Sequence, residues 1–215
     1  MDAALNPREL IDLLPKYFAI SMIGVRNSGK SVMIQAMIKE LIKAKRVDMV
    51  IVMSGSAKLN DDYSFLPESV VMEFNSDLLG KMWSKQVKLK EAGKAEHIFI
   101  VFDDVLANKE AIRNEYINKI WTQGRHVFFS SAILSQYPAY VCSPTILGNS
   151  DMILYSKMNR QSLEKLAYAT TGLSIQEFIR ISEQIAGVDY TFMCINNYCK
   201  DPDPLVYLNY ARASI

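Results

Sequence analysis

The sequence lacks a strong charge bias, because 24 Lys and Arg residues face 23 Asp and Glu residues and leave a net charge of +1 over 215 residues. No overall basic field draws the chain to nucleic acid, so any contact with DNA must come from a local patch. Cysteines are also few, and Cys142, Cys194 and Cys199 show no paired spacing of the kind that holds a metal. They are typical of reduced thiols in an intracellular protein.

Long hydrophobic runs are missing as well. No uninterrupted apolar stretch reaches the ~18 residues that a membrane span needs, so we expect no membrane-spanning segment. The first 18 residues, MDAALNPRELIDLLPKYF, are interrupted by Pro7 and by charged residues, which argues against a signal peptide. They predict instead a short helix with Asn6 as its cap, and the protein is expected in the cytoplasm.

Half of the residues are hydrophobic, and apolar runs alternate with helical patterns. Strands are predicted over 17–23, 48–54, 69–74, 97–105, 125–138 and 151–156, and helices over 31–45, 76–91, 109–123, 160–171 and 174–185. Two further strands close the chain about a turn at 201–204. This alternation predicts an α/β protein with a mainly parallel central sheet, helices on both faces and a C-terminal antiparallel strand pair. We expect a single domain over residues 1–215.

The loop GVRNSGKS, residues 24–31, leaves the first strand and opens the first long helix. Its spacing, G-x-x-x-x-G-K-[ST], predicts a loop whose backbone N–H groups converge on phosphate. Lys30 would place a charge on the β- and γ-phosphates, and Ser31 would offer its hydroxyl to Mg²⁺. The predicted nucleotide-binding residues are Gly24, Val25, Arg26, Asn27, Ser28, Gly29, Lys30, Ser31 and Val32.

Two aspartates, Asp103 and Asp104, end the strand HIFIVFDDV. Strand ends of this kind face the ligand crevice of a parallel sheet, so Asp103 is expected to hold Mg²⁺ and Asp104 to polarise the attacking water. The other interpretation is that the pair starts a loop or caps a helix. Gln136 ends the next buried strand, where it either senses the γ-phosphate or makes ordinary turn hydrogen bonds.

Other phosphate-loop enzymes fit less well. A GTPase would want an Asn-Lys-x-Asp stretch, and ANKEAI (107–112) has alanine where that aspartate would stand. A small-molecule kinase would want an arginine-rich lid, whereas the segment SKMNRQSLEKL contains only Arg160. An ATPase that uses water is therefore favoured.

Five stretches together resemble a known family: GVRNSGKS, SGSAKLNDDYSFLP, FIVFDD, QGRHVFFSSAILSQYP and the closing VDYTFMCI…LVYLNYA. The sequence is similar to the genome-packaging ATPases of double-stranded DNA viruses, the poxvirus-type branch of the FtsK–HerA superfamily, found in giant viruses, virophages and related elements. The resemblance implies a RecA-like (ASCE) P-loop fold. It makes Lys30 and Ser31 the Walker A pair, and it makes Asp103 and Asp104 the Walker B pair. Gln136 would be a polar sensor on a strand between those two motifs.

The resemblance also implies a homo-oligomeric ring, in which a neighbouring subunit supplies an arginine to the bound ATP. Relatives often carry that arginine within the stretch aligned with 143–151, where this sequence has Leu147 and Gly148. Arg125 is our first candidate for the trans-acting arginine and Arg160 the second. An ion pair or helix-end contact within its own subunit is an equal interpretation of Arg125.

The densest basic stretch places Lys81, Lys85 and Lys88 on one side of a predicted helix. They are candidates for contact with the DNA backbone, although most such stripes are solvated outer faces. The expected function is an ATP-driven motor that moves viral double-stranded DNA into a preformed capsid, at a capsid or portal-vertex protein. The alternatives are a HerA-like helicase or transfer ATPase without a capsid, and a nucleotide-dependent binding switch.

Overall fold

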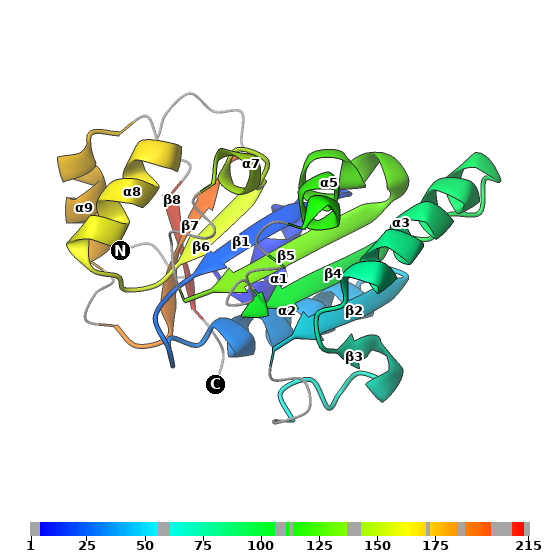
Figure 1. Cartoon of the computed structure of the whole chain (residues 1–215). Coiled ribbons are helices and arrows are strands. Elements are labelled where there is room, and N and C mark those ends of the chain that lie inside the picture. The colour runs from blue at the N-terminus through cyan, green and yellow to red at the C-terminus, as the bar shows by residue number, and fades with distance from the viewer. Residues whose placement is uncertain are drawn as a thin grey trace.

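A computed structural model of the chain describes residues 5–55, 61–105, 111, 114–136, 143–170, 173–184, 188–198 and 208–212. Strands and helices alternate along them (Figure 1). The strands are β1 (Ala19–Ile23), β2 (Met49–Ser54), β3 (Val71–Met72), β4 (Ile98–Asp103), β5 (Phe129–Ser135), β6 (Met152–Tyr155), β7 (Thr191–Asn196) and β8 (Leu208–Arg212). The α-helices are α1 (Pro7–Asp12), α2 (Lys30–Lys43), α3 (Ser76–Glu91), α5 (Glu115–Gln123), α7 (Pro144–Leu147), α8 (Arg160–Thr170) and α9 (Ile175–Glu183).

These strands form one sheet in the order β3-β2-β4-β5-β1-β6-β7-β8. The pairs from β3 to β6 are parallel, whereas β7 and β8 add an antiparallel edge, as predicted. Strand β5 lies between β1 and β4. Its register pairs Ser135 with Ile23 and Leu134 with Asp103, so these three strands end together at one edge of the sheet.

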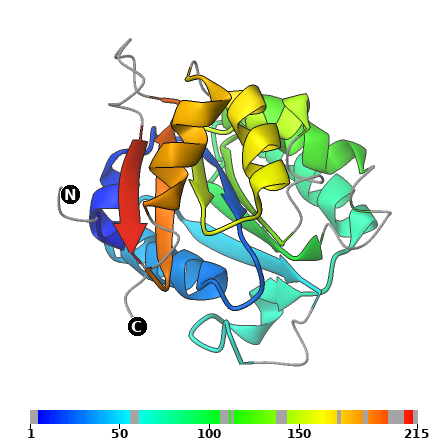
Figure 2. The ribbon, with the colours of Figure 1, turned by 90° about the vertical axis from the view of Figure 1, so that its left-hand side faces the viewer.

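Helices cover both faces of the sheet, and each face has its own hydrophobic core. Apolar side chains of α1 and α2, such as Leu10, Met33 and Met37, pack on one face. Side chains of α3, α5, α8 and α9, such as Leu79, Ile117 and Phe178, pack on the other. Figure 2 shows the antiparallel strands β7 and β8 at the end of this layered arrangement.

Local sequence signals explain the two N-terminal helices. Asn6 and Glu9 form the reciprocal capping box of α1, and Pro7 occupies its first turn. Helix α2 has its apolar stripe buried over Met33, Ile34, Met37, Ile38 and Leu41. Among the described helices, none is both long enough and apolar enough to cross a bilayer.

Several predicted boundaries differ from the structure. The third strand, predicted over 69–74, is only Val71–Met72, because residues 68–70 form a 3₁₀ turn. Helix α5 begins at Glu115, where Asn114 caps it with its side chain, and not at 109. Strand β5 begins at Phe129 because Gly124–Val127 form a second 3₁₀ turn. The four-residue α7 is too short to show a period, and the predicted turn at 201–204 lies outside the described residues.

Candidate nucleotide site

The predicted phosphate loop connects β1 to α2. The backbone N–H of Gly24 donates to the carbonyl of Ser135 over 3.1 Å, which fixes the start of the loop to β5. Gly29 is the N-cap of α2 at φ 88°, a left-handed conformation that glycine adopts without strain. Because the loop leads directly into the N-terminus of α2, free backbone N–H groups and the positive end of the helix dipole favour an anion there.

Gly24 lies where no larger residue fits. A β-carbon at this position would be 2.0 Å from Ser156 Oγ and 2.7 Å from Ser28 Oγ. Both hydroxyl oxygens are buried and have no hydrogen-bond partner among the described residues. Since buried hydroxyls normally have partners, unsatisfied polar groups in and beside this loop fit a polar ligand such as a phosphate.

Lys30 links the loop to the acidic strand end. Its ammonium donates to the carbonyls of Gly24 over 2.8 Å and of Val25 over 2.9 Å, which leaves one of its three donors. Burial lowers the pKa of Lys30, and the charges of Asp103 and Asp104 oppose that shift. The cation and both carboxylates therefore belong to one electrostatic site.

Asp103 is the last residue of β4, and its side chain is buried. Its Oδ2 accepts a hydrogen bond of 2.7 Å from the hydroxyl of Tyr63. Burial raises the pKa of Asp103, the hydrogen bond from Tyr63 lowers it, and the nearby charge of Asp104 raises it again. Sequence reasoning missed Tyr63, because this residue lies in an irregular polar loop without periodicity.

Asp104 and Gln136 meet beside this carboxylate. The backbone N–H of Asp104 donates to the carbonyl of Leu134 over 3.1 Å, and Asp104 takes the left-handed φ of 55°. Gln136 Nε2 donates to Asp104 Oδ2 over 3.0 Å. The structure thus brings the predicted pair and the predicted sensor into contact at the edge that carries the phosphate loop.

The arrangement suits a Mg²⁺ ion that the protein and a bound nucleotide would coordinate together. In the described ranges, no group of three or more His, Cys, Asp or Glu side chains is placed to hold a metal by itself. Magnesium in nucleotide enzymes needs only one or two carboxylates, because phosphate oxygens and waters supply the rest. Asp103 and Ser31 would hold the ion, which would supply charge stabilisation to the terminal phosphate.

The two candidate arginines lie at opposite ends of the strands, Arg125 before β5 and Arg160 after β6. Arg125 precedes β5 in the 3₁₀ turn, and it lines a cavity of about 160 Å³ with Asp151 at the edge away from the phosphate loop. Burial raises the pKa of Asp151, while the hydrogen bond from the backbone of Ala19 and the charge of Arg125 oppose that shift. Arg160 begins α8 shortly after the end of β6, on the loop side, and pairs with Glu164 at 3.1 Å. Both arginines are exposed.

The remaining predicted residues are placed as follows. Val25, Arg26 and Asn27 are exposed at the tip of the loop, Ser28, Gly29 and Ser31 are half-buried, and Val32 is exposed on the first turn of α2. Lys81, Lys85 and Lys88 lie on α3, apart from the nucleotide site, and line an open groove of about 640 Å³ beside Tyr116 of α5.

Solved structures of other proteins share this fold. The genome packaging NTPase B204 of Sulfolobus turreted icosahedral virus 2, in complex with ATP-gammaS, matches with a TM-score of 0.66 and 16% identity over 94% of this chain and 100% of that one. The pCW3 conjugation coupling protein TcpA matches with a TM-score of 0.64 and 17% identity over 92% of this chain and 60% of that one. The cytoplasmic domain of the type VII secretion ATPase EccC from Thermomonospora curvata has a TM-score of 0.64 and 14% identity, with 94% and 26% coverage.

At these identities the likeness concerns the fold alone, and it confirms the predicted α/β architecture with a mainly parallel sheet. A search of curated proteins found no match. The family model of the poxvirus A32 protein, a packaging ATPase, matches residues 9–159, which is more than half of the chain. The matched range contains the phosphate loop, the aspartate pair and Gln136, and so the chain belongs to the poxvirus A32 family of packaging ATPases.

Proposed function

We propose that this protein is an ATP-driven motor that moves viral double-stranded DNA into a preformed capsid. The observation that carries the proposal is the meeting of Lys30, Asp103, Asp104 and Gln136 at one sheet edge, in a chain of the packaging family. The motor would work in the cytoplasm of the host cell, at the site of virus assembly, and would engage a capsid or portal-vertex protein.

The geometry supports the following proposed roles. Lys30 would place its charge among the phosphates, and Asp103 with Ser31 would hold Mg²⁺. Asp104 polarises the attacking water, and Gln136 holds the carboxylate of Asp104 through its 3.0 Å hydrogen bond. Because Gln136 directly follows the last residue of β5, beside the loop, loss of the terminal phosphate would change the hydrogen-bond partners available to it.

Hydrolysis in this site would be completed by a neighbouring subunit. Arg125 lies at the far end of β5 from its own phosphate loop, and seven strand residues at about 3.3 Å each separate the two edges. Within one subunit it cannot reach the nucleotide, so a catalytic Arg125 acts only in a neighbour's site. Arg160 remains the second candidate, and its pairing with Glu164 must break for that role.

Mixed rings test this assignment. Subunits carrying Arg125→Ala and subunits carrying Asp104→Asn are each expected to be inactive alone, and their mixture should recover part of the ATPase activity at hybrid interfaces. No recovery at any ratio, with oligomerisation intact by particle mass, would contradict a trans-acting Arg125. The same mixture with Arg160→Ala then tests the second candidate.

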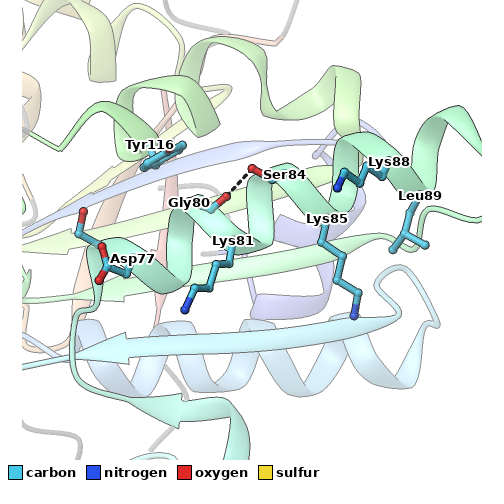
Figure 3. Close-up of a pocket in the computed structure, with 9 residues that line it drawn as sticks. Asp77, Gly80, Lys81, Ser84, Lys85, Lys88, Leu89 and Tyr116 are labelled. Carbon is cyan, nitrogen blue, oxygen red and sulfur yellow. Dashed lines mark hydrogen bonds between the residues drawn. The ribbon is translucent and has the colours of Figure 1, made fainter.

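The side of α3 that carries Lys81 and Lys85 is our candidate for the DNA backbone contact. Figure 3 shows Lys81 and Lys85 extending from the side of α3 that faces away from Tyr116. Asp77 lines the same groove and partly offsets their charge. One subunit with a net charge of +1 would bind DNA weakly, whereas a ring of subunits multiplies the contacts.

Salt dependence tests the DNA contact. The double variant Lys81→Glu/Lys85→Glu should weaken DNA binding and reduce the dependence of log K on log salt, by about 0.9 for each phosphate that is no longer neutralised. The control is Lys43→Glu/Lys45→Glu, which makes the same charge change at the exposed C-terminal end of α2. Equal weakening of DNA binding in both variants would show that net charge alone causes the effect, and it would rule out a specific contact by α3.

ATP turnover tests the motor as a whole. Double-stranded DNA should raise the ATPase rate. Both Lys30→Ala and Asp104→Asn should abolish ATP turnover, with or without DNA. DNA-independent turnover by a stable monomer would contradict the motor and favour a nucleotide-dependent switch. The likeness to a conjugation coupling protein keeps DNA transfer without a capsid as a second candidate, and binding to a capsid-vertex protein separates the two.

A further inference from the structure

Tyr190 lies against the phosphate loop although it is 161 residues beyond Gly29 in sequence. A β-carbon built on Gly29 would be 2.9 Å from Tyr190 Cδ1 and 3.5 Å from Tyr190 Cβ, so the tyrosine packs on the last glycine before Lys30. The topology explains the contact. Strand β7 is antiparallel to β6, so the residue before β7 lies at the edge where β6 ends and where the loop begins.

The conformation of Tyr190 is unusual for a structural residue. Its φ is 54°, in the left-handed region that costs a non-glycine residue about 1–2 kcal/mol. Its side chain is not buried in the core, because 41% of the residue remains exposed. A partly exposed aromatic ring that packs against a ligand-binding loop, in a strained backbone conformation, is a candidate for contact with the ligand.

The sheet order tells which part of a nucleotide would meet this ring. Strands β4 and β5 lie on one side of β1, and they carry the acidic pair and Gln136 that would face the terminal phosphate. Strands β6 and β7 lie on the other side of β1. A nucleotide with its phosphates in the loop and its terminal phosphate toward Asp104 therefore extends its nucleoside toward Tyr190.

We propose that Tyr190 stacks on the nucleoside of the bound nucleotide and thereby determines how strongly the enzyme prefers a nucleotide to a bare polyphosphate. The proposal rests on nucleotide binding at the phosphate loop, as the proposed function requires. Every base has a π-face, so the contact supplies affinity without depending on base edges. Stacking of a base on an aromatic side chain corresponds to roughly a 5- to 150-fold gain in affinity.

Calorimetry of the full-length chain tests the proposal with two ligands, a non-hydrolysable ATP analogue and inorganic tripolyphosphate, both with Mg²⁺. Tyr190→Ala should weaken binding of the ATP analogue by roughly 5- to 150-fold and leave tripolyphosphate unchanged. Tyr190→Phe should keep wild-type affinity for both ligands. Tyr190→Leu keeps an apolar side chain against Gly29 but has no π-face, so it should behave like Tyr190→Ala even if the alanine variant folds poorly.

The control is Tyr198→Ala. Tyr198 lies just beyond the other end of β7, and it is similarly exposed at 51%.

In steady-state assays Tyr190→Leu should raise KM for ATP and change kcat little, because stacking on the nucleoside stabilises the ground and transition states equally.

Three results would overturn the role of Tyr190. Equal weakening of both ligands would make it a support for the loop, and unchanged affinity for both would leave it without a binding role. If the wild-type protein binds tripolyphosphate but shows no preference for the ATP analogue, the nucleoside contact is absent. If it binds neither ligand, the proposed function itself fails, so the two failures are distinguishable.

Discussion

Replacing Tyr63 by Phe removes one hydroxyl from the aspartate pair, and we expect it to destabilise the folded protein. Tyr63 is 4% exposed and donates its hydroxyl to Asp103 Oδ2 over 2.7 Å, while Asp103 itself is 8% exposed. The substitution keeps the ring and nearly all of its packing. It removes a short hydrogen bond to a buried carboxylate, which is then left with an unsatisfied oxygen.

The magnitude follows from the type of bond. A hydrogen bond to a charged group contributes about 1.5–3 kcal/mol to stability, more than a bond between neutral groups. In a domain of 150–250 residues, each kcal/mol corresponds to about 2–4 °C in Tm. The midpoint of Tyr63→Phe should therefore fall by about 3–12 °C near neutral pH.

The difference in stability between wild type and Tyr63→Phe should depend on pH. The bond from Tyr63 favours the ionised form and lowers the pKa of Asp103, so the variant raises that pKa further. Above the folded-state pKa of Asp103 the carboxylate is charged and the full difference between wild type and variant is present. As the pH falls through that pKa, protonation turns the bond into a neutral one, and the difference shrinks to about 1 kcal/mol or less.

The Tm values of wild type and Tyr63→Phe should be measured by thermal unfolding at pH 8 and near pH 4. Tyr168→Phe is the matched control, because Tyr168 is 88% exposed and its hydroxyl is solvated. A Tm difference that stays constant between the two pH values would show that the hydroxyl does not act through the charge of Asp103. A variant as stable as wild type at pH 8 would refute the energetic importance of the bond.

Three further predictions concern titratable groups that are buried or half-buried. Asp103→Asn should raise Tm at pH 8 but not below about pH 4. Burial raises the pKa of Asp103, so the stability that the neutral carboxyl group contributes is lost as the pH rises and the group ionises. Thermal unfolding should show a more stable protein, and ATPase assays an inactive one. Lys30→Ala should reduce ATP turnover at least about 100-fold while circular dichroism remains unchanged, since it removes a preorganised charge at the phosphates. Burial raises the pKa of Cys194 to about 12, so a Cys142→Ser/Cys199→Ser variant should react with a thiol reagent at pH 8 only after denaturant is added, and rapid native labelling would contradict the buried position.

Regular elements were predictable where one periodic signal dominates. Helix α3 has the predicted bounds, Ser76–Glu91, because a cap residue, an apolar stripe and a C-terminal break agree. The phosphate loop was predictable for a similar reason, since the glycine spacing dictates both its conformation and its chemistry. The acidic strand end needed one more step, the rule that parallel strands present their carboxyl ends to the ligand.

Contacts between distant irregular segments were not predictable. Tyr63 and Asp103 are 40 residues apart, and Tyr190 reaches Gly29 only through the pairing of β6 with β7. No local pattern encodes such contacts, because they depend on how the whole sheet is assembled. The position of Arg125 was different: it precedes a strand of a parallel sheet, so chain order alone places it at the edge away from the phosphate loop.

Strand β5 has a mechanical consequence for the site. Its last two carbonyls, from Leu134 and Ser135, receive the N–H groups of Asp104 and Gly24 respectively. The phosphate loop and the acidic turn are thus both hydrogen-bonded to neighbouring carbonyls of one strand, and the next residue is Gln136. If Gln136 contacts the terminal phosphate, as we propose, a movement of its side chain when phosphate leaves would shift both turns together, because β5 connects them.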